Sequence, residues 1–402
     1  MNVLLAAYAC IPNAGTEPGH GWNWALHLSE RGMKVTVLTR TDARSAIEAH
    51  LRDHANPNLD FAYVQLPTTR LKAGTGLHYA LWQWHGVKTA RLLHRTRRFD
   101  VLHHVTYGSI HVPSQLWRIG VPIVFGPIGG GQIAPPEMLS YFGTAQWSER
   151  LRTVFTKSLP YSPWHRHWIK KMSAVMAVNS DTLELIRRMG RQQVRQEFDI
   201  AVPAHLLAEG PRSFPEAFPP IRLLWIGRIV PRKGLFIALD ALATTEYPST
   251  LTIIGEASDE AWVRKAIAGH GLTDRVHWTG KRWPWPEVQA AYLSHDALLF
   301  TSVRETCGAQ LLEAMAVGLP IITLDLHGAR DLVPDQAGVK IPVASPAQVV
   351  RDLAAAVDRF AGLPPAEKNA MSRSGWAFAT RNTWTARAET AARLYDQLLS
   401  AS

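Results

Sequence analysis

The sequence predicts an α/β protein built from two Rossmann-like, doubly wound domains that face each other across a cleft. Three observations support this fold class: short apolar runs alternate with helical patterns in the first half of the chain, a proline-rich stretch interrupts them, and the alternation then restarts. Apolar strands separated by helices form parallel sheets that are covered on both faces. A chain of 402 residues is long enough for two separate cores.

The first domain is predicted to span residues 1–202. Its strands are expected at residues 3–8, 35–39, 61–66, 100–104, 121–125 and 174–179, where apolar side chains follow one another. Helices are expected at residues 21–31, 43–52 and 181–188. A turn containing Gly15, Gly19 and Gly21 separates the first strand from the first helix.

Residues 203–220 are predicted to link the two domains, because prolines cluster there. The second domain is predicted to span residues 221–378, with strands at 221–226, 251–254, 276–279, 297–300 and 320–323. A C-terminal segment, residues 379–402, carries a helix near 382–399, where apolar residues recur at mixed helical spacing.

Composition narrows the class of protein without identifying it. The only two cysteines in the sequence, Cys10 and Cys307, are too few for a disulfide framework. Their spacing in the sequence matches neither a metal-ligand motif nor a redox pair. The start of the chain lacks the cationic region of a signal peptide, and no apolar run has membrane-spanning length. These features favour a cytoplasmic protein, either soluble or peripheral on the inner face of the cell membrane.

The formal net charge is +10, and two stretches that lack acidic residues concentrate it. Their basic and aromatic residues are Arg70, Lys72, Tyr79, Trp82, Trp84, Lys88, Arg91, Arg95, Arg97 and Arg98, then Arg150, Arg152, Lys157, Trp164, Arg166, Trp168, Lys170 and Lys171. Such helices suit an anionic membrane surface. The alternative is a solvated helix whose aromatic side lies in the core. No zinc-finger, RNA-binding or heptad pattern occurs, so nucleic acid is not an expected partner.

Two elements of the second half carry most of the functional information. Arg228 and Lys233 follow the predicted strand at 221–226, which places two cations at its carboxyl end, where open α/β sheets bind ligands. Glu305 and Glu313 lie eight positions apart around a Gly-containing turn that opens a helix. Cations suit a diphosphate, and carboxylates suit sugar hydroxyls.

Together with Gly318-Leu319-Pro320, these elements resemble the donor half of the retaining nucleotide-sugar glycosyltransferases of the GT-B fold, family GT4. The resemblance is specific from Leu223 to Val333 and looser before it. It implies an enzyme that moves a sugar from a nucleoside diphosphate to an acceptor with retention of configuration, without a metal ion or cofactor. It also implies that the last helix packs back on the first domain.

The resemblance assigns roles to individual residues. The expected catalytic residues are Arg228, Lys233 and Glu305: the two cations stabilise the departing diphosphate, and the carboxylate accepts hydrogen bonds from the donor sugar. Arg232 is expected to be a solvated neighbour. Glu313 is expected at the ribose, and Arg282 near a base for which uridine is favoured. The full set of expected donor-binding residues is Gly19, Gly21, Arg228, Lys233, Arg282, Glu305, Cys307, Gly308, Ala309, Gln310 and Glu313.

The expected acceptor-binding residues are His20, His103, His104, Gly129 and Gly130. The sequence departs from the family at Gly126, where many members carry a histidine that lines the sugar site. His103 and His104, at the end of a predicted strand, are candidates to replace it, and a purely structural role is the alternative. The glycines that follow suggest close backbone approach to a bulky ligand.

The sequence therefore predicts a hexosyltransferase that uses a nucleotide-diphosphate sugar, with UDP favoured. The predicted acceptor is a saccharide, either a lipid-linked one in surface polysaccharide synthesis or a small molecule. Two alternatives remain open: a sugar phosphorylase or synthase on the same fold, and a noncatalytic protein that binds sugar nucleotides or a lipid surface. An NAD-dependent dehydrogenase is disfavoured, because no Gly-x-Gly-x-x-Gly with a ribose-binding acid follows a strand.

Overall fold

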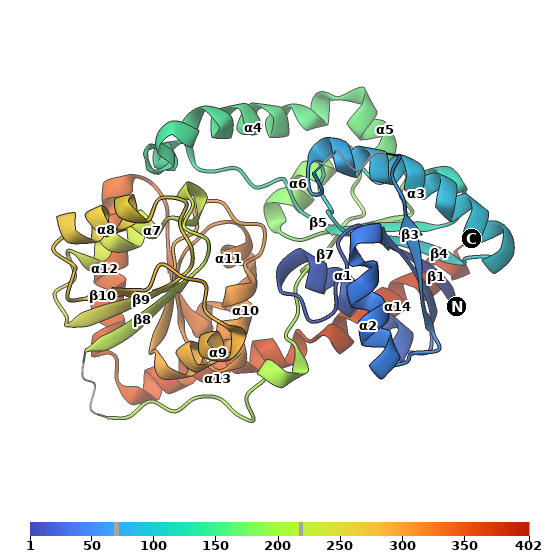
Figure 1. The fold of residues 1–402 in the computed structure, drawn as a ribbon. Coiled ribbons are helices and arrows are strands. Elements are labelled where there is room, and N and C mark those ends of the chain that lie inside the picture. Colours follow the sequence, from blue (N-terminus) through green and yellow to red (C-terminus); the bar gives the residue numbers. More distant parts are fainter. Residues whose placement is uncertain (68–71, 217–219, 402) are drawn as a thin grey trace. The chain divides into compact units, whose positions relative to one another are not determined.

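Two parallel sheets, one in each of two units of the chain, form the framework of the computed structural model (Figure 1). The structure describes residues 1–67, 72–216 and 220–401. Unit 1 comprises Met1–Gly131, Thr156–Ala201 and Trp384–Ser402, and unit 2 comprises Gln132–Phe155 and Val202–Thr383. The predicted α/β class is confirmed.

Unit 1 contains, in the described part of the chain, a seven-stranded sheet in the order β3-β2-β1-β4-β5-β6-β7. Its strands are β1 (Asn2–Ala7), β2 (Lys34–Arg40), β3 (Leu59–Val64), β4 (Val101–Thr106), β5 (Ile123–Ile128), β6 (Ala174–Ala177) and β7 (Arg195–Gln196). Its helices are α1 (Thr16–Glu30), α2 (Arg44–Asp53), α3 (Gly76–Arg97), α5 (Pro163–Lys171), α6 (Ser180–Arg188) and α14 (Trp384–Ser400). Helix α4 (Gln146–Ser158) begins in unit 2 and ends in unit 1.

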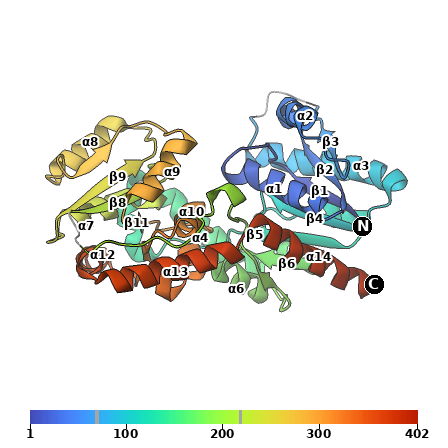
Figure 2. The ribbon, with the colours of Figure 1, turned by 90° about the horizontal axis from the view of Figure 1, so that it is seen from below.

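The central strands of unit 1 are apolar on both faces because helices cover both. On one face, α3 and α5 contribute Trp82 and Trp168 to a core with β4 and β5. On the other face, Trp24 of α1 and Tyr395 of α14 pack against β1. Figure 2 shows α14 beside α1, although more than 350 residues separate them in the sequence. The last helix therefore completes the core of the unit in which the chain begins.

Unit 2 contains a six-stranded sheet within the described residues, in the order β10-β9-β8-β11-β12-β13. Its strands are β8 (Ile221–Ile226), β9 (Ser249–Ile254), β10 (Val276–Trp278), β11 (Ala297–Phe300), β12 (Ile321–Leu324) and β13 (Gly338–Ile341). Its helices are α7 (Leu235–Leu242), α8 (Glu260–Gly269), α9 (Trp285–Ser294), α10 (Ala309–Ala316), α11 (His327–Leu332), α12 (Pro346–Gly362) and α13 (Pro365–Arg381).

Both sheets follow the doubly wound order, in which the chain moves outward from one central strand and then returns to its other side. In unit 2 the reversal falls between β8 and β11, which pair in parallel. The carboxyl ends of strands at such a reversal diverge into a crevice, which is where open α/β sheets bind ligands.

The segment 132–155 lies in the predicted first domain, but in the structure it belongs to unit 2. Met138 and Phe142 are buried in the core formed by β8, α7 and α12, and the Tyr141 hydroxyl donates to Asp240 over 2.6 Å. Apolar burial therefore draws this segment away from the sheet that precedes it in the sequence.

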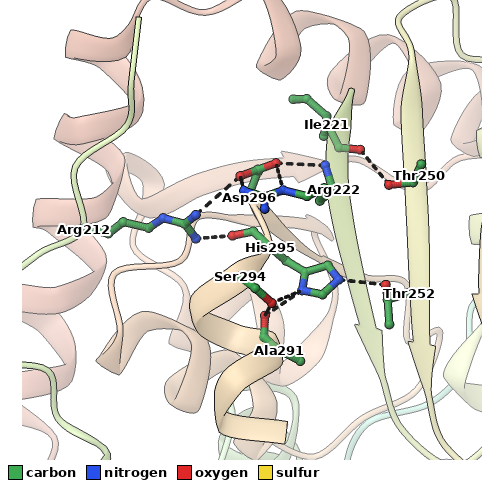
Figure 3. Close-up of polar contacts among 9 residues, drawn as sticks. All are labelled: Arg212, Ile221, Arg222, Thr250, Thr252, Ala291, Ser294, His295 and Asp296. Atoms are coloured by element: carbon green, nitrogen blue, oxygen red, sulfur yellow. Dashed lines mark hydrogen bonds and ion pairs between the residues drawn. The ribbon is translucent and has the colours of Figure 1, made fainter. Parts of the chain in front are cut away.

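The predicted linker is tied to unit 2 through Asp296, at the amino end of β11. Figure 3 shows the carboxylate of Asp296 between Arg212, from the linker, and Arg222, from β8. Arg222 donates through Nη2 and Nε at 2.9 and 3.1 Å, and Arg212 Nη2 lies 3.4 Å from Oδ1. His295 is held by Thr252 Oγ1 at 2.8 Å and by the Ala291 carbonyl at 2.7 Å. This edge is opposite the carboxyl ends of the strands, so its role is structural.

We expect Asp296→Ala to lower the free energy of unfolding of unit 2 by about 2 kcal/mol, because it removes a buried acceptor shared by two guanidinium groups. Thermal denaturation followed by circular dichroism measures the shift in Tm. Asp335→Asn is the control, because the ion pair of Asp335 with Lys340 is exposed to water and contributes little. Equal midpoints for both variants would contradict the structural role of Asp296.

The two basic stretches divide between core and surface. In the first, Tyr79 and Trp82 are buried, whereas Trp84 is exposed; Arg70 lies outside the described residues. In the second, Trp168 is buried and Trp164 is exposed. Each stretch thus places one aromatic side in the core, as expected for a solvated helix that packs on the protein. Each also leaves a further tryptophan at the surface. Among the residues that the structure describes, no helix is long and apolar enough to cross a membrane.

Candidate active site

Three of the predicted donor residues lie in the loops at the carboxyl ends of β8 and β11, where the strand order reverses. Arg228 and Lys233 follow β8, and Glu305 follows β11. Backbone hydrogen bonds join the two loops: the amide of Val303 donates to the Arg232 carbonyl over 2.8 Å. Gly234, at φ +66°, is required here, because a Cβ on it would lie 2.1 Å from the Thr301 carbonyl oxygen. The two loops therefore form one hydrogen-bonded platform.

Glu305 lies at the centre of this platform. Its Oε2 forms an ion pair with Lys233 Nζ and accepts a hydrogen bond from Arg232 Nη1 at 3.1 Å. Its Oε1 accepts from the Thr306 amide at 3.2 Å. The Lys233 ammonium also lies 5.6 Å from the centre of the Phe300 ring, so its charge is held between a carboxylate and an aromatic face.

Burial and charge act against each other in this pair. Burial acts to raise the pKa of Glu305, but the charges of Lys233 and Arg232 outweigh it and hold that pKa below its usual value. Burial, helped by the neighbouring arginines, lowers the pKa of Lys233, and the Glu305 carboxylate opposes this effect. We regard both groups as charged, because each provides the counter-charge that the other needs in a buried position.

Arg232 is part of the site, which corrects the prediction of a solvated neighbour. Its side chain is partly buried and donates to Glu305 and, at 3.4 Å, to the carbonyl of Arg304. Arg232 precedes Lys233 in a 3-10 turn, Pro231–Lys233. The side chains of Arg232 and Lys233 both reach Glu305 only because that turn pairs with the loop after β11. The sequence alone therefore carried no signal for the contact of Arg232 with Glu305.

The segment 132–155 adds residues that the sequence analysis did not assign to this site. Gln132 Nε2 donates to Thr306 Oγ1 over 2.7 Å, and Arg152 of α4 donates to the Gln132 carbonyl over 2.8 Å. Arg304 forms an ion pair with Glu149 of α4, with a separation of 2.6 Å from Nε to Oε1. The loop that carries Glu305 is therefore braced from the side by α4.

The platform has an excess of positive charge. Its cations are Arg152, Arg228, Arg232, Lys233 and Arg304, and its carboxylates are Glu149 and Glu305. Burial lowers the pKa of Arg152 to about 10, and the nearby guanidinium of Arg304 adds to this effect. Fixed cations of this kind are suited to a diphosphate, which brings the missing negative charge.

The amino end of α10 supplies backbone donors beside these cations. Gly308 caps the helix at φ +99°, where a Cβ would lie 2.9 Å from the Phe300 ring, so glycine is required. The amides of Ala309 and Gln310 are in the first turn, whose N–H groups have no partner within a helix. Cys307 is buried and adjoins Gly328 of α11, which agrees with packing rather than chemistry.

Glu313, in the next turn of α10, accepts a hydrogen bond from the buried Tyr292 hydroxyl over 2.7 Å. Burial raises the pKa of Glu313, and the tyrosine hydroxyl opposes that shift. Tyr292 orients this carboxylate, a role for which the sequence carries no signal. Arg282 is exposed in the loop between β10 and α9, and its place near the base stays a prediction.

The glycines near the start of unit 1 are helical, which corrects the predicted turn. Helix α1 begins at Thr16, so Gly19 and Gly21 lie inside it. A Cβ on Gly19 would lie 1.9 Å from the Ala14 carbonyl oxygen, and one on Gly21 would lie 2.0 Å from that of Ala9. Both glycines allow the helix to approach the preceding loop, which is a packing requirement.

His103 and His104 are fully buried, contrary to the expectation that they face a ligand. His103 Nε2 donates to the Gly126 carbonyl over 2.7 Å, which leaves Nδ1 to accept from the Tyr395 hydroxyl at 2.5 Å. His104 contacts the hydroxyl of Tyr79 at 3.0 Å. Burial lowers the pKa of His103 to about 4 and that of His104 to about 3, so both rings are neutral and structural.

The backbone at Gly126 explains the absence of a histidine at that position. Gly126 has φ +139°, and a Cβ there would lie 2.4 Å from the Met176 carbonyl oxygen. No side chain fits this backbone. Gly130 is similarly restricted, because at its φ of +111° a Cβ would lie 2.9 Å from His111 Nδ1. Gly129 exchanges backbone hydrogen bonds with Gly108 and Ile110.

His20 lies on α1 with its ring 5.9 Å from that of Trp384, and burial lowers its pKa to about 4. It is therefore neutral at physiological pH. Within residues 1–67, 72–216 and 220–401, no three His, Cys, Asp or Glu side chains are grouped so that they could hold a metal ion.

Comparison with known proteins adds to this geometry. Residues 212–371 match the family model described as glycosyl transferases group 1. A 2-deoxystreptamine glucosyltransferase of Streptomyces kanamyceticus is 35 % identical over 352 residues, which cover 83 % of this chain and 86 % of that protein. A GDP-mannose-dependent alpha-mannosyltransferase of Mycobacterium tuberculosis is 28 % identical over 274 residues, 64 % of this chain and 65 % of that relative. Sucrose-phosphate synthase from Thermosynechococcus elongatus has the same fold over 100 % of both chains, with a TM-score of 0.69 and 18 % identity. The predicted GT-B fold is confirmed.

Proposed function

Because this chain belongs to the family of group 1 glycosyl transferases and is a glycosyltransferase, we propose that it transfers a hexose from a nucleotide-diphosphate sugar bound in unit 2 to an acceptor bound by unit 1. The observation that carries the donor assignment is the pair of cations, Arg232 and Lys233, that contact Glu305 at the strand reversal. Arg228 adds a third positive charge that acts on Lys233. A diphosphate complements these cations, and a sugar hydroxyl complements the carboxylate.

The proposed reaction proceeds with retention on the front face of the sugar. The bond from the anomeric carbon to the diphosphate oxygen breaks, and the acceptor oxygen bonds to that carbon on the same side. The acceptor proton passes to the departing phosphate oxygen, which gains charge as the bond breaks. Arg228 and Lys233 stabilise that charge, and Glu305 orients the sugar. This scheme needs no histidine base, in keeping with the buried positions of His103 and His104.

For the donor we propose a UDP-sugar, and for the acceptor a lipid-linked saccharide at the inner face of the cell membrane. The exposed tryptophans and the basic stretches support a site of action at an anionic surface. The names of the relatives include a GDP-mannose-dependent enzyme and one that acts on 2-deoxystreptamine, so both a guanine donor and a small acceptor belong in any screen.

A thermal-shift screen against UDP, GDP, ADP and their sugars tests the donor assignment. We expect one nucleoside diphosphate to raise Tm by several degrees at a concentration about a hundredfold above its Kd. Proton NMR of the product formed with the matching sugar then reports its anomeric configuration. No stabilisation by any nucleotide would overturn the assignment, and an inverted product would overturn the front-face mechanism.

We expect nucleotide binding to be independent of divalent cations, because arginine and lysine side chains already provide the charge that faces the diphosphate. Calorimetry with the nucleoside diphosphate in excess EDTA should give a Kd within about twofold of that measured with magnesium. Binding that is lost in EDTA and restored by magnesium would show that a metal ion, and not these side chains, neutralises the diphosphate.

A further inference from the structure

Helix α4 is labelled in Figure 1. In contrast to an ordinary surface helix, it exposes its apolar face and buries a charged residue. Trp147, Leu151 and Val154 recur at the spacing i, i+4, i+7 and therefore share one face. Their exposed fractions are 69 %, 54 % and 67 %. On the opposite face, Glu149 is only 5 % exposed. The helix thus buries a carboxylate and presents a stripe of large apolar side chains to the surroundings.

Polar contacts hold α4 in this orientation. Glu149 forms the ion pair with Arg304, and Arg152 donates to the Gln132 carbonyl. Turning the apolar stripe inward would break both contacts and leave a carboxylate and two guanidinium groups without their partners, which is costly. The exposure of the stripe is therefore a stable property of the fold, and an exposed apolar stripe of this kind marks an interaction surface.

The charges around the stripe indicate what covers it. Arg150 and Lys157 lie on one flank of the helix and are exposed. From residue 150 to residue 180 the sequence contains six lysines and arginines and no acid. Cations beside exposed aromatic and aliphatic side chains complement an anionic bilayer, which offers phosphate groups above an apolar interior.

We propose that the Trp147, Leu151 and Val154 face of α4 is the surface by which this protein docks on an anionic lipid bilayer, with the neighbouring cations against the lipid phosphates. This inference rests on the proposed function in one respect: a lipid-linked acceptor would lie in that bilayer. A second copy of the chain is the less suitable occupant, because it would bring together two positively charged segments that lack acids to offset the repulsion.

Flotation with vesicles of phosphatidylglycerol and phosphatidylcholine, and of phosphatidylcholine alone, tests the proposal. We expect binding to the anionic vesicles that weakens in high salt, because surface cations contribute to it. Replacing the stripe by Trp147→Gln, Leu151→Gln and Val154→Gln together should lower the partition coefficient at least about tenfold. Leu293→Gln is the matched control, since Leu293 is a 60 % exposed leucine on α9 outside this surface, and it should bind like the wild type.

Two further measurements separate the possible results. Nucleotide binding by calorimetry should be the same in the triple variant and the wild type, which shows that the variant is folded and that its donor site is intact. Light scattering reports the molar mass: a wild-type dimer that the triple variant abolishes would identify a self-interface and overturn the proposal. Absence of vesicle binding in the wild type, or equal binding by the triple variant, would overturn it as well. Vesicle binding without nucleotide binding would leave the docking surface standing and reject the donor assignment.

Discussion

Lys233→Ala is expected to lower turnover by at least about a hundredfold, equivalent to ~3 kcal/mol of transition-state stabilisation. The ammonium of Lys233 is buried beside Glu305 and held over Phe300, so its position is set before the donor binds. In a water-poor site, a preorganised cation stabilises the charge that develops on a leaving diphosphate, and water cannot replace it at the same cost. Initial rates at saturating donor and acceptor measure the effect.

The loss of Lys233 also leaves Glu305 without its nearest counter-charge, which could itself disturb the site. A second variant is therefore needed that removes a cation and leaves this ion pair in place. Arg228 is exposed, and Arg228→Ala should lower turnover on the same scale with an unchanged Tm. Lys265→Ala is the control, because Lys265 is an exposed cation on α8 in the same unit. Near-normal turnover in both the Lys233 and the Arg228 variants would refute the assignment of these cations to the diphosphate.

Glu305→Gln is expected to reduce turnover about a hundredfold while the affinity for the free nucleoside diphosphate stays the same or increases. The substitution keeps the shape of the side chain but removes the negative charge beside Lys233 and Arg232. The platform then becomes more positive, which favours the diphosphate, but the donor sugar loses a charged acceptor for its hydroxyls. Steady-state rates together with calorimetry of nucleotide binding separate the two effects.

Glu287→Gln provides the comparison, since Glu287 is an exposed acid in the first turn of α9. It should change neither quantity. If Glu305→Gln weakened the binding of the free nucleoside diphosphate as strongly as it reduced turnover, the carboxylate would be needed to maintain the platform itself, and its direct role toward the sugar would be rejected.

The sequence by itself determined the class of fold and the donor motif. Alternating apolar strands and helices predicted both parallel sheets, because a strand buried on two faces must be apolar throughout its length, as in Val3-Leu4-Leu5 and Leu298-Leu299. The weakest elements were missed: β13 (Gly338–Ile341) is short and contains Lys340, and β7 has only two residues. Arg228 and Lys233 could be placed at the carboxyl end of a strand because they follow the apolar run at 221–226, and the resemblance to family GT4 implied the role of Glu305.

Only the tertiary structure decided what surrounds those residues. Arg232 reaches Glu305, and Gln132 and α4 brace the same loop, through contacts between segments 73 to 174 residues apart. Local sequence patterns carry no information on such contacts. Each of these polar side chains could equally well be solvated, so its presence in the sequence does not show that two distant segments meet. The same reason explains why the prediction for His103 and His104 was wrong. Histidines at the end of a strand are typical of a ligand site, but α3 and α14 pack over β4 and bury both rings in the core, where they are neutral. The tertiary structure also decided the orientation of helix α4: Glu149 is buried in an ion pair with Arg304, and Trp147, Leu151 and Val154 on the opposite face are exposed.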